Sequence, residues 1–453
     1  MPEFKFYRSN SYILFFSNFP MRGLSVLIFG AGAREHAISR AYEKSPQVEK
    51  IIVAPGDDFI SYNREKEVII DGTCNLRNPR SMRILAEKYK PDLIDVAQDD
   101  ALASGAVDLL QRCGFAVFGS SRRAAQLEAN KAWSRDFMKR HEIPSPDFMV
   151  FDSERKAKDY AEDLFRKNPT KVVYVKASGL CGGKGALKAT SMEETFERIK
   201  QMKNFGKAGK SFLIEDALEG EEFSYFAISD GENYKILGSA RDYKRALDND
   251  KGEQTGGMGA VSPARATEGI EKEIERELVS KAIRGMGKEG VPLKGVLYVG
   301  GTEIKKKPFC IEYNVRWGDP ECQVVLPGLQ NDYVDVVKAS IEGKLNEINL
   351  IHDSKTRVCV VGVARGYPDA NSPEYKNSQG KRIFGLEDVM KIPEIEIYGA
   401  GIKIEDGKFF VDGGRLFSIV GKGKDASDKS YDAISRIRIE GDNLHYRRDV
   451  GRD

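Results

Sequence analysis

A short apolar run followed directly by glycines and a helix start limits what the first part of this chain can fold into. Residues 24–29 predict a strand, Gly30-Ala-Gly32 a tight turn, and the segment from Arg34 the first turn of a helix. A strand that passes through glycines into a helix is typical of parallel α/β domains. We therefore expect the folded chain to begin with such a domain.

Later segments extend this prediction to about residue 125. Strand-like runs at 51–54, 93–96 and 116–118 alternate with helical stretches, of which 101–112 is the last. Such alternation predicts a parallel sheet covered by helices. The first twenty residues are rich in aromatic side chains and are treated as an N-terminal extension, 1–20, outside this fold.

The glycine turn is also a candidate phosphate site, because backbone N–H groups at a helix start bind anions with help from the helix dipole. A dinucleotide fingerprint is incomplete here, since Glu35 occupies the third glycine position and would repel a pyrophosphate. Arg34 and His36 suit one terminal phosphate better. A histidine at a helix start is about as often structural, so both interpretations of His36 stay open.

Composition excludes several other classes. With 453 residues, of which 41% are hydrophobic and 31% charged, the chain should form roughly two to four domains. Its net charge of +2 gives no bulk preference for nucleic acid. No apolar run approaches the roughly 20 residues of a membrane helix. Six cysteines lack metal-binding or disulfide spacing, which favours the reducing cytoplasm.

Residues 311–321 predict a metal, phosphate and substrate site at one strand end. Alternation places Glu312, Asn314 and Arg316 on one face and apolar side chains on the other. Glu312 and Asn314 would lie about 6 to 7 Å apart along the strand, close enough to share Mg²⁺. Trp317-Gly-Asp-Pro then breaks the strand. The alternative is a half-exposed edge strand followed by a polar turn.

Two glycine-rich loops suggest a site for several phosphates or two substrates. The first, 178–185, follows a strand at 171–177 and predicts a phosphate flap to which Lys184 adds charge. Because Gly185 follows this lysine, the loop is not a P-loop, and a glycine-rich hairpin without a ligand is the alternative. The second, 255–259, follows a basic pair.

Two further segments complete the pattern. A helix is predicted from 130 to 141. Two strand-like runs within 212–226 flank an acidic turn, which would present backbone groups to an adenine and a carboxylate to a ribose. An acidic turn is more often solvated surface, so that interpretation also stays open.

These motifs stand in a fixed order along the chain. They are Lys131, Lys176, Gly182-Gly-Lys-Gly185, Gly220-Glu-Glu222, Thr255-Gly-Gly-Met-Gly259 and Glu312-x-Asn314-x-Arg316-x-Gly-Asp-Pro-Glu321. In this combination the chain resembles the phosphoribosylamine–glycine ligases, a family of ATP-grasp enzymes. The resemblance runs from about residue 24 to the end. It includes Gly30-x-Gly-x-Arg-Glu-His36, Arg365-Gly-Tyr-Pro368, Gly413-Gly-Arg415 and the tail at 446–451.

The resemblance implies that ATP phosphorylates the glycine carboxylate and that the amine of 5-phosphoribosylamine attacks the acyl phosphate. The products would be glycinamide ribonucleotide, ADP and phosphate, in de novo purine biosynthesis in the cytoplasm by a monomer or weak dimer. The implied architecture is multidomain, mixing α/β and α+β. It has an N-terminal parallel α/β domain at 21–125, an ATP-grasp domain at 126–345 with a lid at about 145–218, and a C-terminal mixed α/β domain at 346–453.

The resemblance also implies residue roles. ATP would contact Lys131, Lys176, Gly182, Gly183, Lys184, Gly185, Glu215 and Glu222. Mg²⁺ or Mn²⁺ would bind Glu312 and Asn314, with Glu303 ranked below them. Catalysis would use Arg316, Lys244 and Asp319. Glycine and phosphoribosylamine would contact Gly32, Arg34, Glu35, His36, Asp99, Asp242, Arg245, Thr255, Gly256, Gly257, Asp319 and Glu321.

One segment departs from the family pattern. Where members usually carry Gly-Pro-Glu, this chain reads Val96-Ala-Gln-Asp-Asp100, so Asp99 or Asp100 would replace the glutamate. The shorter acid would alter how the substrate site closes. In the C-terminal part, strands are predicted at 358–364 and 416–420 and a helix from 425, and Arg447 and Arg448 are expected in a solvated tail.

Three other functions compete with this one. A different ATP-grasp carboxylate–amine ligase would share Lys176, Glu312 and Asn314 but lack the Arg-Glu-His loop and the Arg-x-Gly-Asp-Pro-Glu motif, both of which are present. A nucleotide sensor without activity would have lost the metal ligands or the flap lysine, and this chain keeps them. A nicotinamide-dependent dehydrogenase ranks third, because the dinucleotide fingerprint is incomplete.

Overall fold

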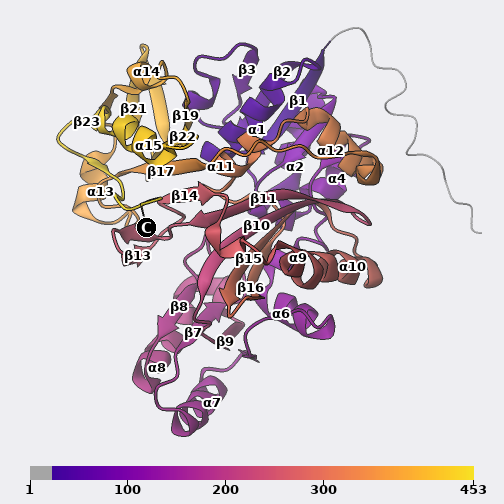
Figure 1. The fold of residues 1–453 in the computed structure, drawn as a ribbon, viewed down its shortest axis with the longest axis vertical. Coiled ribbons are helices and arrows are strands. Elements are labelled where there is room, and N and C mark those ends of the chain that lie inside the picture. Colours follow the sequence, from indigo (N-terminus) through magenta and orange to yellow (C-terminus); the bar gives the residue numbers. More distant parts are fainter. Residues whose placement is uncertain (1–22, 453) are drawn as a thin grey trace, which may run out of the picture.

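The structure is a computed structural model that describes residues 23–452, so the predicted extension at 1–20 lies outside the described residues. The N-terminal unit is a parallel sheet in the order β3-β2-β1-β4-β5 (Figure 1). Its strands are β1 Leu24–Gly30, β2 Val48–Pro55, β3 Glu67–Ile70, β4 Leu93–Val96 and β5 Val117–Phe118. The predicted parallel α/β start is confirmed.

Helices accompany this sheet. They are α1 Ala33–Lys44, α2 Pro79–Tyr89, α3 Asp99–Ser104, α4 Ala106–Arg112 and α5 Gln126–Ala129. The single helix predicted over 101–112 is wrong. Gly105 adopts a left-handed conformation with φ 88° and divides the segment into α3 and α4. Helix α3 begins at Asp99, directly after the loop that follows β4.

A second unit projects away from the rest of the molecule at the bottom of Figure 1. Its antiparallel sheet, in the order β6-β9-β7-β8, carries α7 and α8 and has its own apolar core. Its elements are β6 Phe148–Phe151, α7 Glu154–Lys167, β7 Val173–Ala177, β8 Ala186–Ala189, α8 Met192–Gln201 and β9 Phe212–Asp216. The first glycine-rich loop, 178–185, joins β7 to β8. Helix α6, Lys131–Arg140, precedes this unit and matches the predicted helix.

The long central sheet has the order β16-β15-β10-β11-β14-β17-β22-β19, and β24 pairs with β17. Its strands are β10 Glu221–Asp230, β11 Tyr234–Asp242, β14 Gly259–Ser262, β15 Lys294–Ile304, β16 Lys307–Asn314, β17 Arg357–Ala364, β19 Ile395–Gly399, β22 Arg415–Lys422 and β24 Leu444–His445. The β14–β17 pair makes the sheet continuous across the predicted domain border near residue 345.

Helices pack against this sheet, and two smaller sheets complete the fold. The helices are α9 Glu271–Ile274, α10 Lys281–Lys288, α11 Cys322–Val325, α12 Tyr333–Glu342, α13 Pro373–Ser378, α14 Leu386–Val389 and α15 Ala426–Ser435. The small sheets pair β12 Arg245–Leu247 with β13 Lys251–Gln254, and order β20 Ile402–Glu405, β21 Lys408–Val411, β18 Arg382–Phe384 and β23 Arg438–Ile439.

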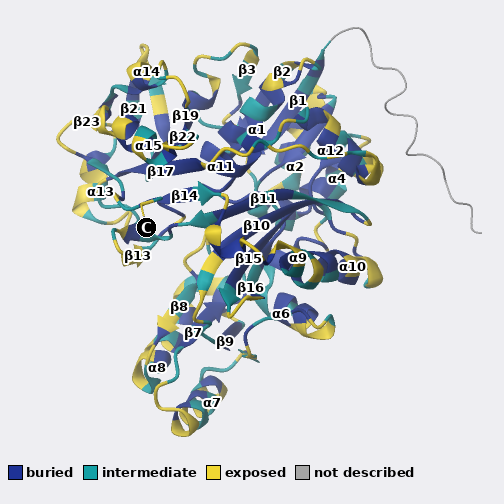
Figure 2. Cartoon of the chain, viewed as in Figure 1, coloured by how far each residue is buried: buried dark blue, intermediate teal, exposed yellow. Residues whose placement is uncertain are grey.

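Burial follows this layering (Figure 2), with the central strands buried and the outer helices exposed on one side. The predicted C-terminal strands and helix are confirmed as β17, β22 and α15. The predicted solvated tail is wrong for Arg447, which is 1% exposed, although Arg448 is exposed. Over residues 23–452, no helix is both long and apolar enough to cross a membrane.

Candidate active site

A cavity of about 340 Å³ lies where the N-terminal unit, the projecting unit and the central sheet meet. Most of the predicted site residues line it, although they come from distant parts of the chain. They are Arg34, Asp99, Lys131, Lys176, Gly182, Gly183, Gly185, Glu215, Asp242, Lys244, Thr255, Gly256, Glu312, Asn314, Arg316, Asp319 and Glu321. One concave site therefore gathers the cations, carboxylates and glycine loops.

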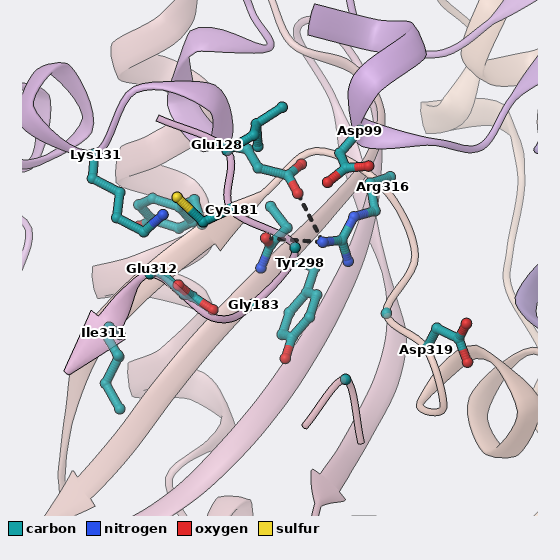
Figure 3. A pocket seen from close by; sticks show the side chains of 18 of the residues that line it. Asp99, Glu128, Lys131, Cys181, Gly183, Tyr298, Ile311, Glu312, Arg316 and Asp319 are labelled. Atoms are coloured by element: carbon teal, nitrogen blue, oxygen red, sulfur yellow. Dashed lines mark hydrogen bonds and ion pairs between the residues drawn. The ribbon is translucent and has the colours of Figure 1, made fainter. Parts of the chain in front are cut away.

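The end of β16 presents hard oxygen ligands to this cavity. Glu312 and Asn314 alternate with the buried Tyr313, so both side chains point inward. Burial would raise the pKa of the Glu312 carboxyl, but the nearby lysines, led by Lys244, hold that pKa at about 2. No described side chain donates a hydrogen bond to this ionised carboxylate. In Figure 3 it lies near Lys131 and opposite the flap.

These two residues fit a divalent cation that arrives with a phosphate ligand. Mg²⁺ is commonly bound by one or two carboxylates together with substrate phosphates and water. Among the described residues, no group of three or more histidine, cysteine or acidic side chains could hold a metal alone. The donor set at Glu312 and Asn314 is thus a partial shell, which a nucleotide would complete.

Several predicted residues do not line the cavity. They are Gly32, Glu35, His36, Lys184, Glu222, Arg245, Gly257 and Glu303. Glu303 lies beyond the cavity near the β15–β16 turn, where its carboxylate accepts the N–H of Lys306. Glu222 borders a small adjoining recess, 3.8 Å from the ammonium of Lys244. Gly257 lies directly behind the lining, where an added Cβ would meet Pro320 at 2.4 Å.

His36 occupies a structural position. Its ring packs edge-on against Phe59 and Tyr398, and its Nδ1 accepts the N–H of Gly399 at 3.0 Å. The side chain is fully buried. The structure therefore favours the structural interpretation of this histidine, which links α1 to β19.

The wall below the flap is held by a buried ion-pair network. Glu215 accepts from Arg135 Nε at 2.9 Å and also pairs with the Lys176 ammonium. Burial would raise the pKa of Glu215, but Arg135 and Lys176 keep it below its ordinary value. Arg135 in turn donates to the carbonyl of Ile311 at 2.6 Å. One oxygen of Glu215 pairs with Lys176 and the other with Arg135, so this carboxylate orients Lys176 from within the wall.

Arg316 is paired with an acid that the sequence did not reveal. Its Nη2 lies 2.8 Å from Glu128 Oε1, and the other Glu128 oxygen accepts the N–H of Val315 at 2.9 Å. Arg316 Nη2 also donates to Asn314 Oδ1 at 3.3 Å. The pair of Arg316 with Glu128 is drawn as a dashed line in Figure 3, and together these contacts fix the guanidinium beside the candidate metal ligands.

A second acidic group lies beside Lys244. The Tyr298 hydroxyl donates to Glu321 Oε1 at 2.7 Å, and Ser224 Oγ donates to the same oxygen at 3.1 Å. Asp242 is close by, and its Oδ1 is buried without a hydrogen-bond partner. Burial and the charge of Glu321 raise the pKa of Asp242 well above its ordinary value. The cavity thus contains an unpaired acceptor near a cation.

Arg415 from β22 closes the remaining side. It donates to the carbonyl of Gly256 at 2.6 Å and pairs with Asp319 Oδ2 at 3.0 Å. The other Asp319 oxygen accepts from Gln323 at 2.7 Å. Arg415 therefore fastens the second glycine-rich loop to the turn after β16. Neither Arg415 nor Glu128 was predicted as a site residue. Glu128 is a lone acid without a local motif, and Gly413-Gly-Arg415 contributed to the family resemblance without indicating a role for the arginine.

The N-terminal unit contributes Arg34 and Asp99. Arg34 Nε donates to Glu35 Oε1 at 2.7 Å, and Nη1 donates to the carbonyl of Trp317 at 3.2 Å. Glu35 folds back under the glycine turn, so that a Cβ at Gly30 would lie 2.5 Å from its Cγ. Arg34 therefore faces the cavity, while the predicted substrate contact Glu35 supports it from beneath.

The buried Glu35 leads to a pH prediction for the ligand-free protein. Burial is the main cause that raises the pKa of this carboxyl, from about 4.5 to about 7. Between these values the folded chain keeps a proton that the unfolded chain releases. The stability that this group contributes is present below about pH 4.5 and is lost as pH rises through 7.

A comparison with Glu35→Gln isolates this effect, because the amide does not titrate. Relative to the variant, the natural protein should lose about 3 kcal/mol of unfolding free energy between about pH 4.5 and 7.5, at about 1.4 kcal/mol per pKa unit. Urea unfolding at several pH values measures the difference. A constant difference across that range would show that Glu35 is ionised throughout.

The fold and the cavity together define the class of protein. A projecting four-stranded unit closes over a central antiparallel sheet, and between them lie cations opposite a Glu–Asn pair, which is the arrangement of an ATP-grasp enzyme. Three family models match in order, those of the phosphoribosylglycinamide synthetase N domain (24–128), ATP-grasp (A) domain (129–322) and C domain (357–453). The chain belongs to the phosphoribosylglycinamide synthetase family.

Individual relatives agree with this assignment. The phosphoribosylamine–glycine ligase of Caldanaerobacter subterraneus subsp. tengcongensis is 36% identical over 94% of this chain and 99% of its own length. That of Chlorobaculum tepidum is 36% identical with the same coverage. A crystal structure of phosphoribosylamine–glycine ligase from Thermotoga maritima superposes with a TM-score of 0.76 at 30% identity, covering 94% of this chain and 100% of that one.

Proposed function

We propose that this chain ligates glycine to 5-phosphoribosylamine at the expense of ATP, giving glycinamide ribonucleotide, ADP and phosphate. The observation that carries the proposal is the cavity itself. It combines the Glu312–Asn314 pair, the cations Lys131 of α6 and Lys176 of β7, and Arg34 from a separate domain. An enzyme that joins a phosphorylated acid to an amine needs these three elements in one enclosed site.

The nucleotide end is assigned to the side of the cavity beneath the flap. Lys131 and Lys176 would neutralise the ATP phosphates, with Lys176 held in place by Glu215. ATP-grasp domains use ATP with a divalent cation, and Glu312 and Asn314 would hold Mg²⁺ or Mn²⁺ against those phosphates. The bound ion would supply charge neutralisation where negative charge develops.

The acyl-transfer step is then mainly positioning and charge stabilisation. The glycine carboxylate attacks the terminal phosphoryl group, ADP leaves, and glycyl phosphate forms. Arg316, fixed by Glu128, and Lys244 stabilise the growing negative charge on the phosphoryl oxygens. The amine of phosphoribosylamine next attacks the acyl carbon and phosphate leaves. The raised pKa of Asp242 makes its carboxylate a stronger base, and Oδ1 of that carboxylate would accept a proton of the amine.

Water must be kept from the acyl phosphate, and the flap at 178–185 is suited to this task. Lys184 reaches from the flap to the carbonyl of Pro368 at 3.4 Å, so the flap already meets the C-terminal unit. We assign the segment at about 145–218 as the lid of an ATP-grasp domain at 126–345. This domain would lie between an N-terminal domain at 21–125, preceded by the extension at 1–20, and a C-terminal domain at 346–453.

The substrate side is assigned to the N-terminal unit. Asp99 begins α3 and faces the cavity beside Arg34. We propose that it takes the place of the usual family glutamate toward the phosphoribosyl group. The competing function is the ligation of a different carboxylate and amine on the same fold. That reaction would use the same nucleotide contacts, and its substrate would make different contacts with Asp99 and Arg34.

The test is phosphate release from ATP and Mg²⁺ with glycine and freshly prepared phosphoribosylamine, with each substrate omitted in turn. Release that requires both substrates, with mass-spectrometric detection of glycinamide ribonucleotide, is the expected result. Release with a different acid or amine would reassign the substrate. We also propose that the protein is cytoplasmic and is a monomer or weak dimer. The described residues include six free cysteines, which supports the cytoplasmic assignment.

A further inference from the structure

The last described residues of the chain pass directly behind two loops that line the cavity. We call residues 443–451 the C-terminal strap. Within it, Arg447 is 1% exposed, and its guanidinium binds Asp449 through Nε at 2.8 Å and Nη2 at 2.6 Å. Nη1 binds Asp250 at 2.7 Å and the carbonyl of Arg245 at 3.3 Å. The guanidinium also lies over the ring of Tyr243, 5.0 Å from its centroid.

The rest of the strap follows the same hairpin, β12–β13. Arg448 N–H donates to Asp248 at 2.7 Å, and Asp449 accepts the N–H of Asn249 at 2.8 Å. Gly451 N–H donates to the Tyr243 hydroxyl at 3.1 Å. The strap is therefore joined to the hairpin through both backbone and side-chain contacts.

Tyr243 stands between two cavity residues. Its side chain is buried in the C-terminal core with Val450, whereas its neighbours Asp242 and Lys244 line the cavity. Alternation along the chain places the tyrosine on the opposite side from these two. A contact that fixes the tyrosine ring therefore fixes the direction in which Asp242 and Lys244 point.

The strap also supports the second glycine-rich loop. A Cβ at Gly259 would lie 2.8 Å from the Val450 side chain, so the missing side chain makes room for the strap. Thr255 N–H donates to the carbonyl of Lys244 at 2.8 Å, which links the loop to the hairpin. Both cavity loops thus rest on one continuous segment.

We propose that Arg447 is a positioning residue for the ligation, which acts through Tyr243 and the hairpin to hold Asp242 and Lys244 in the cavity. The proposal rests on the proposed function, because those two residues are assigned to the acyl-transfer step. It assigns no direct substrate contact to Arg447. Nucleotide binding should depend on Arg447 much less, because the main phosphate contacts, Lys131 and Lys176, come from α6 and β7.

The experiment compares Arg447→Met with Arg448→Met, a matched pair of adjacent arginines of which one is buried and one exposed. In Arg447→Met, kcat should fall on the order of 100-fold, because a small misplacement of Asp242 and Lys244 relative to the reacting groups has an effect of this size. ADP affinity should stay within about threefold, since the nucleotide end keeps its own contacts. Arg448→Met should retain the kcat of the natural protein.

Two further readouts separate positioning from general destabilisation. Amide hydrogen exchange should become faster at 243–259 in Arg447→Met, while the sheet of the N-terminal unit stays protected. Millimolar guanidinium ion should restore part of the rate of Arg447→Ala, because it can refill the vacated site. Unchanged kcat and exchange in Arg447→Met would overturn the proposal, as would a loss of ADP affinity equal to the loss of kcat. Exchange needs no substrate, so it tests the strap even if the ligation itself is assigned wrongly.

Discussion

Replacing Glu312 by glutamine is expected to lower kcat on the order of 1,000-fold. A loss of this size is typical when one preorganised electrostatic contact to a transition state is removed. The reason is the state of this carboxylate. It is ionised, with a pKa of about 2, and no described side chain donates to it, so it is available as a ligand. An amide keeps the shape but loses the charge. Steady-state rates measured over a range of Mg²⁺ concentrations provide the test.

The matched control is Glu303→Gln, since both glutamates were predicted as metal ligands. Glu303 lies outside the cavity, and its carboxylate is used within the β15–β16 turn. The control should keep kcat within about threefold, as is usual for a surface substitution. Equal losses in the two variants would contradict the metal site drawn here, and so would a Glu312→Gln variant with more than a tenth of the natural rate.

Replacing Glu215 by leucine should destabilise the fold by roughly 3–5 kcal/mol, the cost of removing one partner from a buried ion pair. The carboxylate is 3% exposed and is shared by Arg135 and Lys176. Its loss leaves two cations in a buried wall. Equilibrium urea unfolding of the ligand-free protein measures the effect, and the nucleotide affinity should fall because Lys176 is no longer oriented.

A control and a double variant separate this role from a direct contact with the ribose. Glu222 was predicted to serve the same adenosine pocket, but its side chain is 59% exposed, so Glu222→Gln should change the free energy of unfolding by less than about 0.5 kcal/mol. Adding Lys176→Met to Glu215→Leu should recover part of the lost stability, because one unpaired cation disappears. A fully stable Glu215→Leu variant with weaker ATP binding alone would instead support the ribose contact.

Local patterns explain what the sequence predicted correctly. Alternation at 311–316 identified the inward face of β16, and the glycine turns marked the breaks between elements. Asn130 caps the predicted helix α6 by accepting the N–H of Trp133. Each of these features depends on a few residues that are neighbours along the chain, so it can be predicted from a single sequence.

Contacts between distant residues could not be read in this way. Glu128 meets Arg316 across 188 positions of the chain, and a lone glutamate in a short helix carries no signal of that partner. Arg447 looked like part of a solvated basic tail, because its burial depends on Asp250 and on Tyr243. His36 stood beside a glycine turn, yet its ring packs against residues of the C-terminal unit.

We expect this chain to activate the glycine carboxylate by phosphorylation. Glycine labelled with ¹⁸O in its carboxylate tests this activation directly, because attack on ATP and later cleavage of the acyl phosphate transfer one labelled oxygen to phosphate. With phosphoribosylamine and ATP present, the released phosphate should carry one ¹⁸O for each glycinamide ribonucleotide formed. Unlabelled phosphate, or phosphate released at the same rate without glycine, would contradict the account.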